Sequence, residues 1–340
     1  MQRLPGLFLS VFLCLGLLAA GIPQAGAAEK QSFSDVPPQH FAYEAVEYLK
    51  ERQILSGYSD GTFRPGAKVN RAEALKIIVN QLLSDDQAAK YKTSSFTDVT
   101  ADAWYLRYVE WALVKGIIQG PPKVTAFNPS KSVTKAEFLK MFLMSRGVDP
   151  KSFDDILLPF SRDVADPKEW YYPYLRYAIA ASMTTASTDG SYAPQRQITR
   201  SDVALFLHRY LLYRMGQQTQ VLLSETEKEL TKTIDTLAAR NVTGAGYTSA
   251  RALTMMRGAR EIRPDEPMVK AVLKITEGYR SLVRAFQASQ KDDWKTVEKL
   301  STDAWFLGDQ AKKITSSANA LGNQLEQYAK SFADQARTSQ

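Results

Sequence analysis

Three basic residues occupy the same place in a recurring motif, and a fixed cation is a group that can bind an anion. Arg71, Lys135 and Arg200 each lie six positions after the proline of an aromatic-x-Pro turn. Each also stands one position after a residue that can cap a helix and two positions before an acid, as in Asn70-Arg71-Ala-Glu73. This spacing predicts a capping box at the start of a helix, with the cation in the first turn.

A cation in the first turn of a helix opposes the helix dipole, at a cost of a few tenths of a kcal/mol. Its presence in all three motifs therefore indicates a second role, and two explanations fit. One is a salt bridge to a carboxylate of a neighbouring unit, for which Asp35, Asp98 and Asp163 are candidates. The other is capture of a carboxylate or phosphate beside the free N–H groups of the helix start.

The elements that carry these cations are repeated units. Each unit opens on an aromatic residue and an Asp-Val pair, first as Phe33-Ser-Asp35-Val36, and the openings at Phe33, Phe96 and Phe160 are 63 and 64 residues apart. The third opening has one additional residue, Arg162. Apolar residues recur at helical spacing on both sides of a Gly- and Pro-marked loop, so each unit is expected to be a helix-loop-helix that stacks on its neighbours.

The first unit resembles the S-layer homology (SLH) domain. It has the F-x-D-V opening, an early aromatic at Phe41, a G-x-x-D-G-T-F-x-P loop that starts at Gly57, and a closing helix start with Arg71. The second unit has Lys135 where the family has Arg, and its loop lacks the Asp-Gly turn. The third unit has Thr184-Thr185 where a glycine is expected.

The resemblance implies grooves between repeats that bind secondary cell-wall polymers bearing pyruvate ketals. In such grooves the first-turn Arg meets the pyruvyl carboxylate, and the early aromatic flanks the sugar. For Trp104 and Trp170, burial in the core fits equally well. We expect one good groove and one or two degraded ones. The candidate glycan-binding residues are Asp35, Phe41, Gly57, Arg71, Trp104, Lys135, Trp170 and Arg200.

Residues 1–28 have the layout of a secretory signal peptide, with Arg3, an apolar run from Leu7 to Ala20, and small residues at the end. The three repeats are predicted over 29–84, 92–148 and 156–214, and a helical bundle over 215–340.

Composition limits the class of partner. The only cysteine, Cys14, lies in the predicted signal peptide, so neither disulfides nor thiolate metal sites are expected after cleavage. The net charge of +7 favours an anionic partner. For an exported chain this is a wall polymer or a phospholipid head group rather than nucleic acid. The resemblance implies that the wall polymer is a pyruvylated glycan or a peptidoglycan-linked glycan. No later apolar run is long enough to span a membrane.

The last part of the chain shows a heptad pattern. Val297, Ala304, Ala311 and Ala318 fall every seven residues, with Leu300 and its successors as the partner set. This pattern predicts one long C-terminal helix of roughly 40 residues, packed in a three- or four-helix antiparallel bundle. The heptads are also compatible with self-association. Gly308 and Gly322 would then mark either a close helix crossing or a tolerated defect.

The sequence predicts an all-α protein: a pseudo-threefold trio of SLH repeats followed by this bundle. It contains no Ser-His-Asp set, metal-ligand spacing or phosphate-cradling glycine loop, so we expect no catalytic residues, metal or cofactor. The predicted function is a secreted protein anchored non-covalently to a wall polysaccharide, with the bundle as a spacer or assembly module. The alternative is a wall-targeted hydrolase whose active site lies in the C-terminal region.

Overall fold

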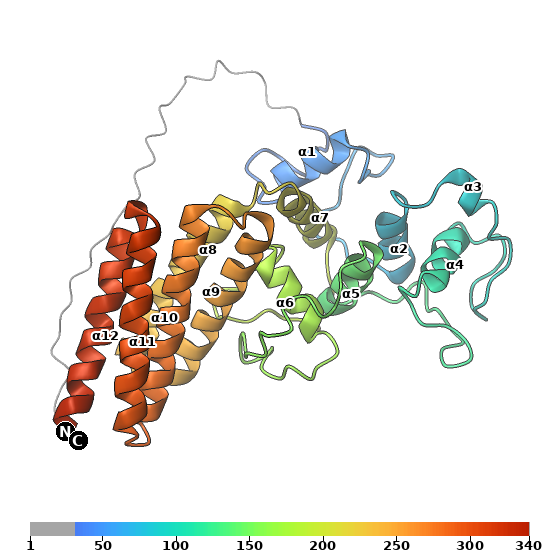
Figure 1. The fold of residues 1–340 in the computed structure, drawn as a ribbon. Helices are drawn as coiled ribbons and strands as arrows, with labels where there is room; N and C mark the ends of the chain where they lie inside the picture. The colour runs from blue at the N-terminus through green and yellow to red at the C-terminus, as the bar shows by residue number, and fades with distance from the viewer. Residues whose placement is uncertain (1–30, 340) are drawn as a thin grey trace, which may run out of the picture.

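A computed structural model describes residues 31–339, and these residues are helical with no β-sheet, which confirms the predicted all-α class (Figure 1). The predicted signal peptide lies outside the described residues. The helices of the repeats are α1 (Tyr43–Glu51), α2 (Arg71–Val79), α3 (Asp85–Ala88), α4 (Leu106–Val114), α5 (Lys135–Ser145), α6 (Tyr172–Ala180) and α7 (Arg200–Arg214). Those of the C-terminal part are α8 (Thr219–Ala238), α9 (Val242–Ile262), α10 (Pro267–Ser289), α11 (Trp294–Ile314), a 3-10 turn (Ser316–Ala318) and α12 (Asn319–Ser339).

The three repeats close into a ring around a pseudo-threefold axis. The backbone N–H of Val69 donates to the carbonyl of Ile198 at 3.2 Å, Ile198 donates to Val133 at 3.1 Å, and Val133 donates back to Val69 at 3.0 Å. These equivalent residues are almost completely buried. Because each repeat both donates to and accepts from a neighbour, the interior backbone groups are satisfied only when all three repeats are present.

The opening aspartate of each repeat fixes the loop of its own repeat. The carboxylate of Asp35 accepts the backbone N–H groups of Phe63 and Arg64, each at 2.7 Å. Asp98 and Asp163 do the same for the equivalent loops. The second residue held in each loop adopts a positive φ of about 50–60°. The residues with this conformation are Arg64, Asn128 and Ala193.

The capping boxes predicted at the starts of α2, α5 and α7 are all present. The side chain of the N-cap residue accepts the N–H of the fourth residue, and the acid accepts the N–H of the cap. The boxes fix where each closing helix begins, and they place Arg71, Lys135 and Arg200 at its first position.

The C-terminal part is a bundle of five helices, α8–α12, and the prediction of one long C-terminal helix is wrong. The chain reverses after Ile314, because Thr315 is extended, and α12 packs antiparallel beside α11. Gly308 and Gly322 mark the close crossing of these two helices: a Cβ on Gly308 would lie 2.9 Å from the carbonyl oxygen of Gly322. Only glycines allow this approach.

The bundle packs directly on the third repeat, where α9 lies against α6 (Figure 1). A Cβ on Gly258 of α9 would lie 1.9 Å from the carbonyl oxygen of Ala180, so the two backbones are in contact. One hydrophobic core runs from the repeats into α8, α9 and α10. Repeat 3 and the bundle therefore form one packed unit.

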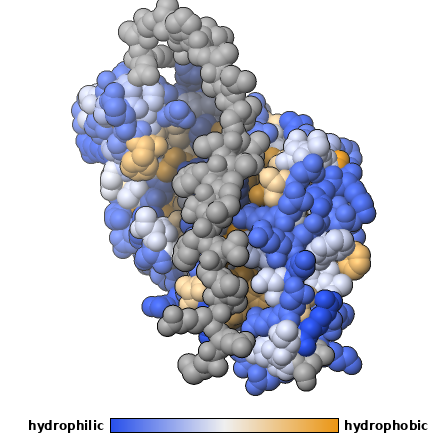
Figure 2. All heavy atoms as spheres, turned by 90° about the vertical axis from the view of Figure 1, so that its left-hand side faces the viewer, coloured by the Kyte–Doolittle hydropathy of each residue, from blue (hydrophilic) through white to orange (hydrophobic). Residues whose placement is uncertain are grey.

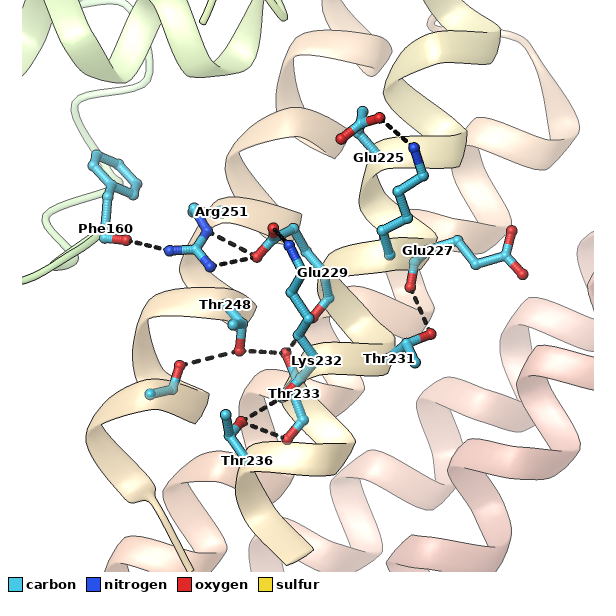
Figure 3. Close-up of polar contacts among 12 residues, drawn as sticks. Phe160, Glu225, Glu227, Glu229, Thr231, Lys232, Thr233, Thr236, Thr248 and Arg251 are labelled. Carbon is cyan, nitrogen blue, oxygen red and sulfur yellow. Dashed lines mark hydrogen bonds and ion pairs between the residues drawn. The ribbon is translucent and has the colours of Figure 1, made fainter. Parts of the chain in front are cut away.

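A buried ion pair reinforces this junction. Arg251 of α9 is 5% exposed, and its Nε and Nη2 contact Glu229 of α8 at 2.7 Å. Its Nη1 donates to the carbonyl of Phe160, in the opening of repeat 3, at 2.8 Å (Figure 3). Lys232 reaches the other oxygen of Glu229 at 2.9 Å. We call the Glu229–Arg251–Phe160 contact the junction clamp.

The outer face of the bundle is mainly hydrophilic where it is visible, with isolated apolar side chains (Figure 2). Among the helices of residues 31–339, none is both long and apolar enough to cross a bilayer.

Candidate functional site

Each first-turn cation reaches into the loop of the next repeat rather than its own. Arg71 of repeat 1 donates from Nε to the carbonyl of Phe127 in repeat 2 at 2.8 Å. Lys135 of repeat 2 donates to Tyr192 in repeat 3 at 2.7 Å. The ring closes when Nε of Arg200 donates to Phe63 of repeat 1 at 2.7 Å. Every groove is therefore built from two repeats.

The salt-bridge explanation for these cations is wrong. Asp35, Asp98 and Asp163 use their carboxylates to hold backbone N–H groups of the loops. Within residues 31–339 neither arginine forms an ion pair with a carboxylate, and nor does Lys135, which donates to a hydroxyl and a carbonyl. The positive charges of the grooves are thus not neutralised by direct contact with the protein.

Burial makes the charged state of these groups more costly. Desolvation lowers the pKa of Arg71, partly offset by the negative charges of Glu137 and Asp98. It also lowers the pKa of Arg200. Lys135 is affected most visibly: burial lowers its pKa to about 8, and the nearby Arg196 acts in the same direction. An anionic ligand would offset this cost because it stabilises the charged form.

The two arginines keep donors free for such a ligand. The Nη groups of Arg71 make no hydrogen bond to any described residue. Arg200 uses one Nη group, which donates to the carbonyl of Ser56 at 2.7 Å, and leaves the other free. Two free N–H groups on a planar guanidinium suit a carboxylate, which accepts in a bidentate manner. Arg71 has the better geometry for this contact.

The groove at Lys135 contains a cleft of about 400 Å³. It is formed by the loop of repeat 3 and one face of α7. Nζ of Lys135 donates to the hydroxyl of Thr184 at 3.1 Å, in addition to the bond to Tyr192. The side chains of α7 that line it are Asp202, Leu205, Phe206 and Arg209.

The early aromatics are on the surface. Phe41 is 74% exposed, Trp104 53% and Trp170 46%, so burial of the two tryptophans in the core is excluded. Each tryptophan packs edge-on against the next residue, Tyr105 or Tyr171, and leaves a flat ring accessible. By contrast, the aromatic side chains of Trp111 in α4 and Tyr177 in α6 are buried.

A lysine of the preceding repeat stands over each exposed tryptophan. Nζ of Lys76 lies 5.5 Å from the ring centre of Trp104, and Nζ of Lys140 lies 5.5 Å from that of Trp170. Sequence reasoning missed these lysines. Their signal is a second basic residue five positions after the first-turn cation, in repeats 1 and 2 only, because repeat 3 has Leu205 there.

Gly57 has a packing role. A Cβ at this position would lie 2.2 Å from the ring of Phe33 and 2.6 Å from the carbonyl oxygen of Thr62. The backbone hydrogen bonds after α6 align Thr184 with Leu55, so the residue equivalent to Gly57 in repeat 3 is Ala186 rather than Thr184 or Thr185.

The S-layer homology domain model matches this chain at residues 32–75, 95–139 and 165–204. The chain carries three S-layer homology domains. Their matched segments coincide with the three repeats of the ring, which confirms the resemblance seen in the motifs.

Relatives with these domains have different kinds of function. The chain is 29% identical to the S-layer protein EA1 of Bacillus anthracis, over 67% of this chain and 27% of that protein. It is 30% identical to a cellulosome-anchoring protein of Acetivibrio thermocellus, over 43% of this chain and 32% of that protein. It is 28% identical to an uncharacterized cell wall amidase of Bacillus anthracis, over 57% and 35% of the two chains.

The matches thus span between 27% and 35% of the length of these relatives. The S-layer homology domains and the S-layer relatives indicate a location at the cell wall or cell surface.

Proposed function

We propose that this protein is anchored non-covalently to an anionic secondary cell-wall polysaccharide, which the grooves between its S-layer homology domains bind. The observation that carries the proposal is the set of cations Arg71, Lys135 and Arg200, which are partly or fully buried and unpaired with any carboxylate of the described chain. The name of the cellulosome-anchoring relative supports an anchoring role.

Pyruvylated sugars fit these grooves chemically. The pyruvyl carboxylate would accept from the free Nη groups of Arg71, and the sugar ring would stack on an exposed aromatic. Asp35 and Gly57 take part indirectly, because one holds the loop and the other lets it pack closely.

The three grooves are expected to differ in affinity. Lys135 is buried and already donates to two protein oxygens. Leu205 of α7, which lines this cleft, occupies the position that Lys76 and Lys140 hold in α2 and α5. We therefore rank the groove of Lys135 lowest, with Arg71 ahead of Arg200 because Arg200 has one Nη group fewer to offer.

The five-helix bundle acts, in this proposal, as a spacer or assembly module held in fixed orientation on repeat 3. Self-association through its outer face belongs to the same proposal. The amidase relative keeps a wall hydrolase as the second candidate, with its site in the C-terminal region.

Sedimentation with isolated walls tests the anchor. Arg71→Lys is the sharpest variant, because a lysine can still donate to the Phe127 carbonyl, as Lys135 does to Tyr192, but has no fork for a carboxylate. We expect it to bind walls roughly tenfold more weakly, the equivalent of one charge-assisted hydrogen bond. Arg337→Gln, which removes a charge that is 61% exposed in the bundle, is the matched control and should bind normally.

Three results would contradict the proposal. The first is wall binding by Arg71→Lys and Arg200→Lys that equals binding by the unchanged protein, and the second is full binding to walls stripped of their ketals by mild acid. Time-dependent release of muropeptides would instead favour the hydrolase.

A further inference from the structure

A second cleft lies where repeat 3 meets the bundle, and it shares only Ser187 and Ser191 with the groove at Lys135. Its volume is about 770 Å³, within the range of small-molecule sites. We call it the junction cleft. Its walls are the opening and loop of repeat 3, the end of α8 and the start of α9. The lining residues are Arg162, Asp163, Ser187, Thr188, Asp189, Gly190, Ser191, Lys232, Thr236, Asn241, Thr243, Gly244, Tyr247, Thr248 and Arg251.

No aliphatic apolar residue occurs in this lining. The floor is rigid, because Arg251 and Thr248 are each 5% exposed and hydrogen-bonded (Figure 3). The hydroxyl of the fully buried Thr233 donates to the hydroxyl of Thr248 at 2.8 Å. The hydroxyl, amide and charged groups of this lining suit a molecule rich in hydroxyl groups.

The two carboxylates of the junction cleft already accept hydrogen bonds from the protein, whereas several donor side chains of its lining form none. Asp163 holds the backbone of its loop, and Asp189 accepts from Ser187 and Ser191. The side chains of the lining that make no hydrogen bond to any described residue include a cation, two hydroxyls and a phenol. These are Arg162, Thr188, Thr243 and Tyr247.

Arg162 is the additional residue of the third opening. Its insertion makes an antiparallel bridge between Ser161 and Val164, and Arg162 lies in this short turn, exposed and unpaired. Repeats 1 and 2 have neither this residue nor a bundle against their loops. Within residues 31–339 the additional residue and the junction cleft thus occur at the same repeat.

We propose that the junction cleft binds a short saccharide that carries a carboxylate. Arg162 receives the carboxylate, Thr188 and Thr243 bond to sugar hydroxyls, and the ring of Tyr247 packs on a sugar face. The inference goes beyond the proposed wall anchor, on which it depends only for the source of the saccharide. It gives the bundle a direct part in glycan binding.

Nuclear magnetic resonance of the ¹⁵N-labelled full chain separates the two kinds of site, because glycine amides report on each. Gly244 reports on the junction cleft alone, and Gly190 lies in the loop that this cleft shares with the groove of Lys135, whereas Gly57 and Gly120 lie in the loops of the other two grooves. The probes are the disaccharide of N-acetylglucosamine and N-acetylmuramic acid, which has a carboxylate, and chitobiose, which has none. We expect saturable shifts of Gly190 and Gly244 at millimolar concentrations of the first probe and much weaker binding of chitobiose.

Arg162→Gln should weaken binding of the acidic disaccharide about tenfold and leave chitobiose unaffected. Lys168→Gln, an exposed charge in the same segment of repeat 3, is the matched control and should change neither. Tyr247→Ala should weaken both sugars and Tyr247→Phe neither, which separates stacking from loss of the hydroxyl.

The proposal is overturned if neither probe shifts Gly190 or Gly244, or if Arg162→Gln and Tyr247→Ala leave the shifts unchanged. Shifts confined to Gly57 and Gly120 would overturn the junction cleft and support the wall anchor. Conversely, Arg71→Lys is expected to weaken wall binding about tenfold without changing the shifts of Gly244, so each proposal can fail alone.

Discussion

The geometry of the junction clamp predicts which of two variants loses more stability. Glu229→Leu leaves Arg251 buried, with only the carbonyl of Phe160 as a partner. Arg251→Met leaves Glu229 with Lys232, whose side chain is 58% exposed and can follow it. Breaking a buried pair costs about 3–5 kcal/mol when the remaining charge has no compensation. We therefore expect about 3–5 kcal/mol for Glu229→Leu and about 1–3 kcal/mol for Arg251→Met, where Lys232 compensates.

The double variant Glu229→Leu/Arg251→Met should be less unstable than Glu229→Leu alone, since no buried charge remains. Equilibrium unfolding in urea, followed by circular dichroism, measures all three free energies of unfolding. Lys228→Met/Glu225→Leu, which removes an exposed pair one turn away, is the matched control and should change stability by less than about 1 kcal/mol.

Two outcomes would refute this reasoning. One is an Arg251→Met variant that is less stable than Glu229→Leu, because the compensation by Lys232 would then be absent. The other is a loss below 1 kcal/mol in both single variants, which would mean that the clamp is solvated rather than buried.

Two further predictions concern single residues. Burial lowers the pKa of Lys135 to about 8 from 10.5, so between these pH values the unfolded chain binds more protons than the native chain. The free energy of unfolding should therefore rise with pH in this range, by about 2–3 kcal/mol relative to the Lys135→Met variant. A slope that is equal in both proteins in urea titrations at pH 7.5–10.5 would contradict this. Gly258→Ala places a Cβ against the backbone of Ala180 and should lower the free energy of unfolding by about 1–3 kcal/mol. Gly246 lies in the same helix beside open space, so Gly246→Ala should raise the free energy of unfolding by up to about 1 kcal/mol. Thermal unfolding compares the two, and equal midpoints would show that the α6–α9 contact is looser than described.

Local signals made the repeats predictable. A capping box such as Asn70–Glu73 involves residues three apart, so its sequence pattern is sufficient to locate the start of α2. The partner of the cation is not local. Arg71 and Phe127 are 56 residues apart, and they meet only because the ring brings the loop of one repeat to the closing helix of the previous one.

The C-terminal part shows two limits of periodicity. The heptad pattern indicates which residues are apolar. It does not distinguish one continuous helix from a helical hairpin with its turn at Thr315, because both bury the same apolar positions. Helix α9 was not predicted because its buried face mixes polar residues such as Ser249 and Thr254 with alanines and methionines, which leaves no continuous aliphatic stripe. Their hydroxyls donate to carbonyls of the preceding turn, which allows small polar residues to be buried without an apolar stripe.

The closed ring of Val69, Val133 and Ile198 has a mechanical consequence. Within residues 31–339 the bundle packs against repeat 3, so tension on the bundle enters the repeats there. From there the ring can pass the load to repeats 1 and 2 through backbone hydrogen bonds on both sides. A polymer bound in any groove contacts two repeats. Detachment under load would therefore require the ring to open or several grooves to release the polymer together.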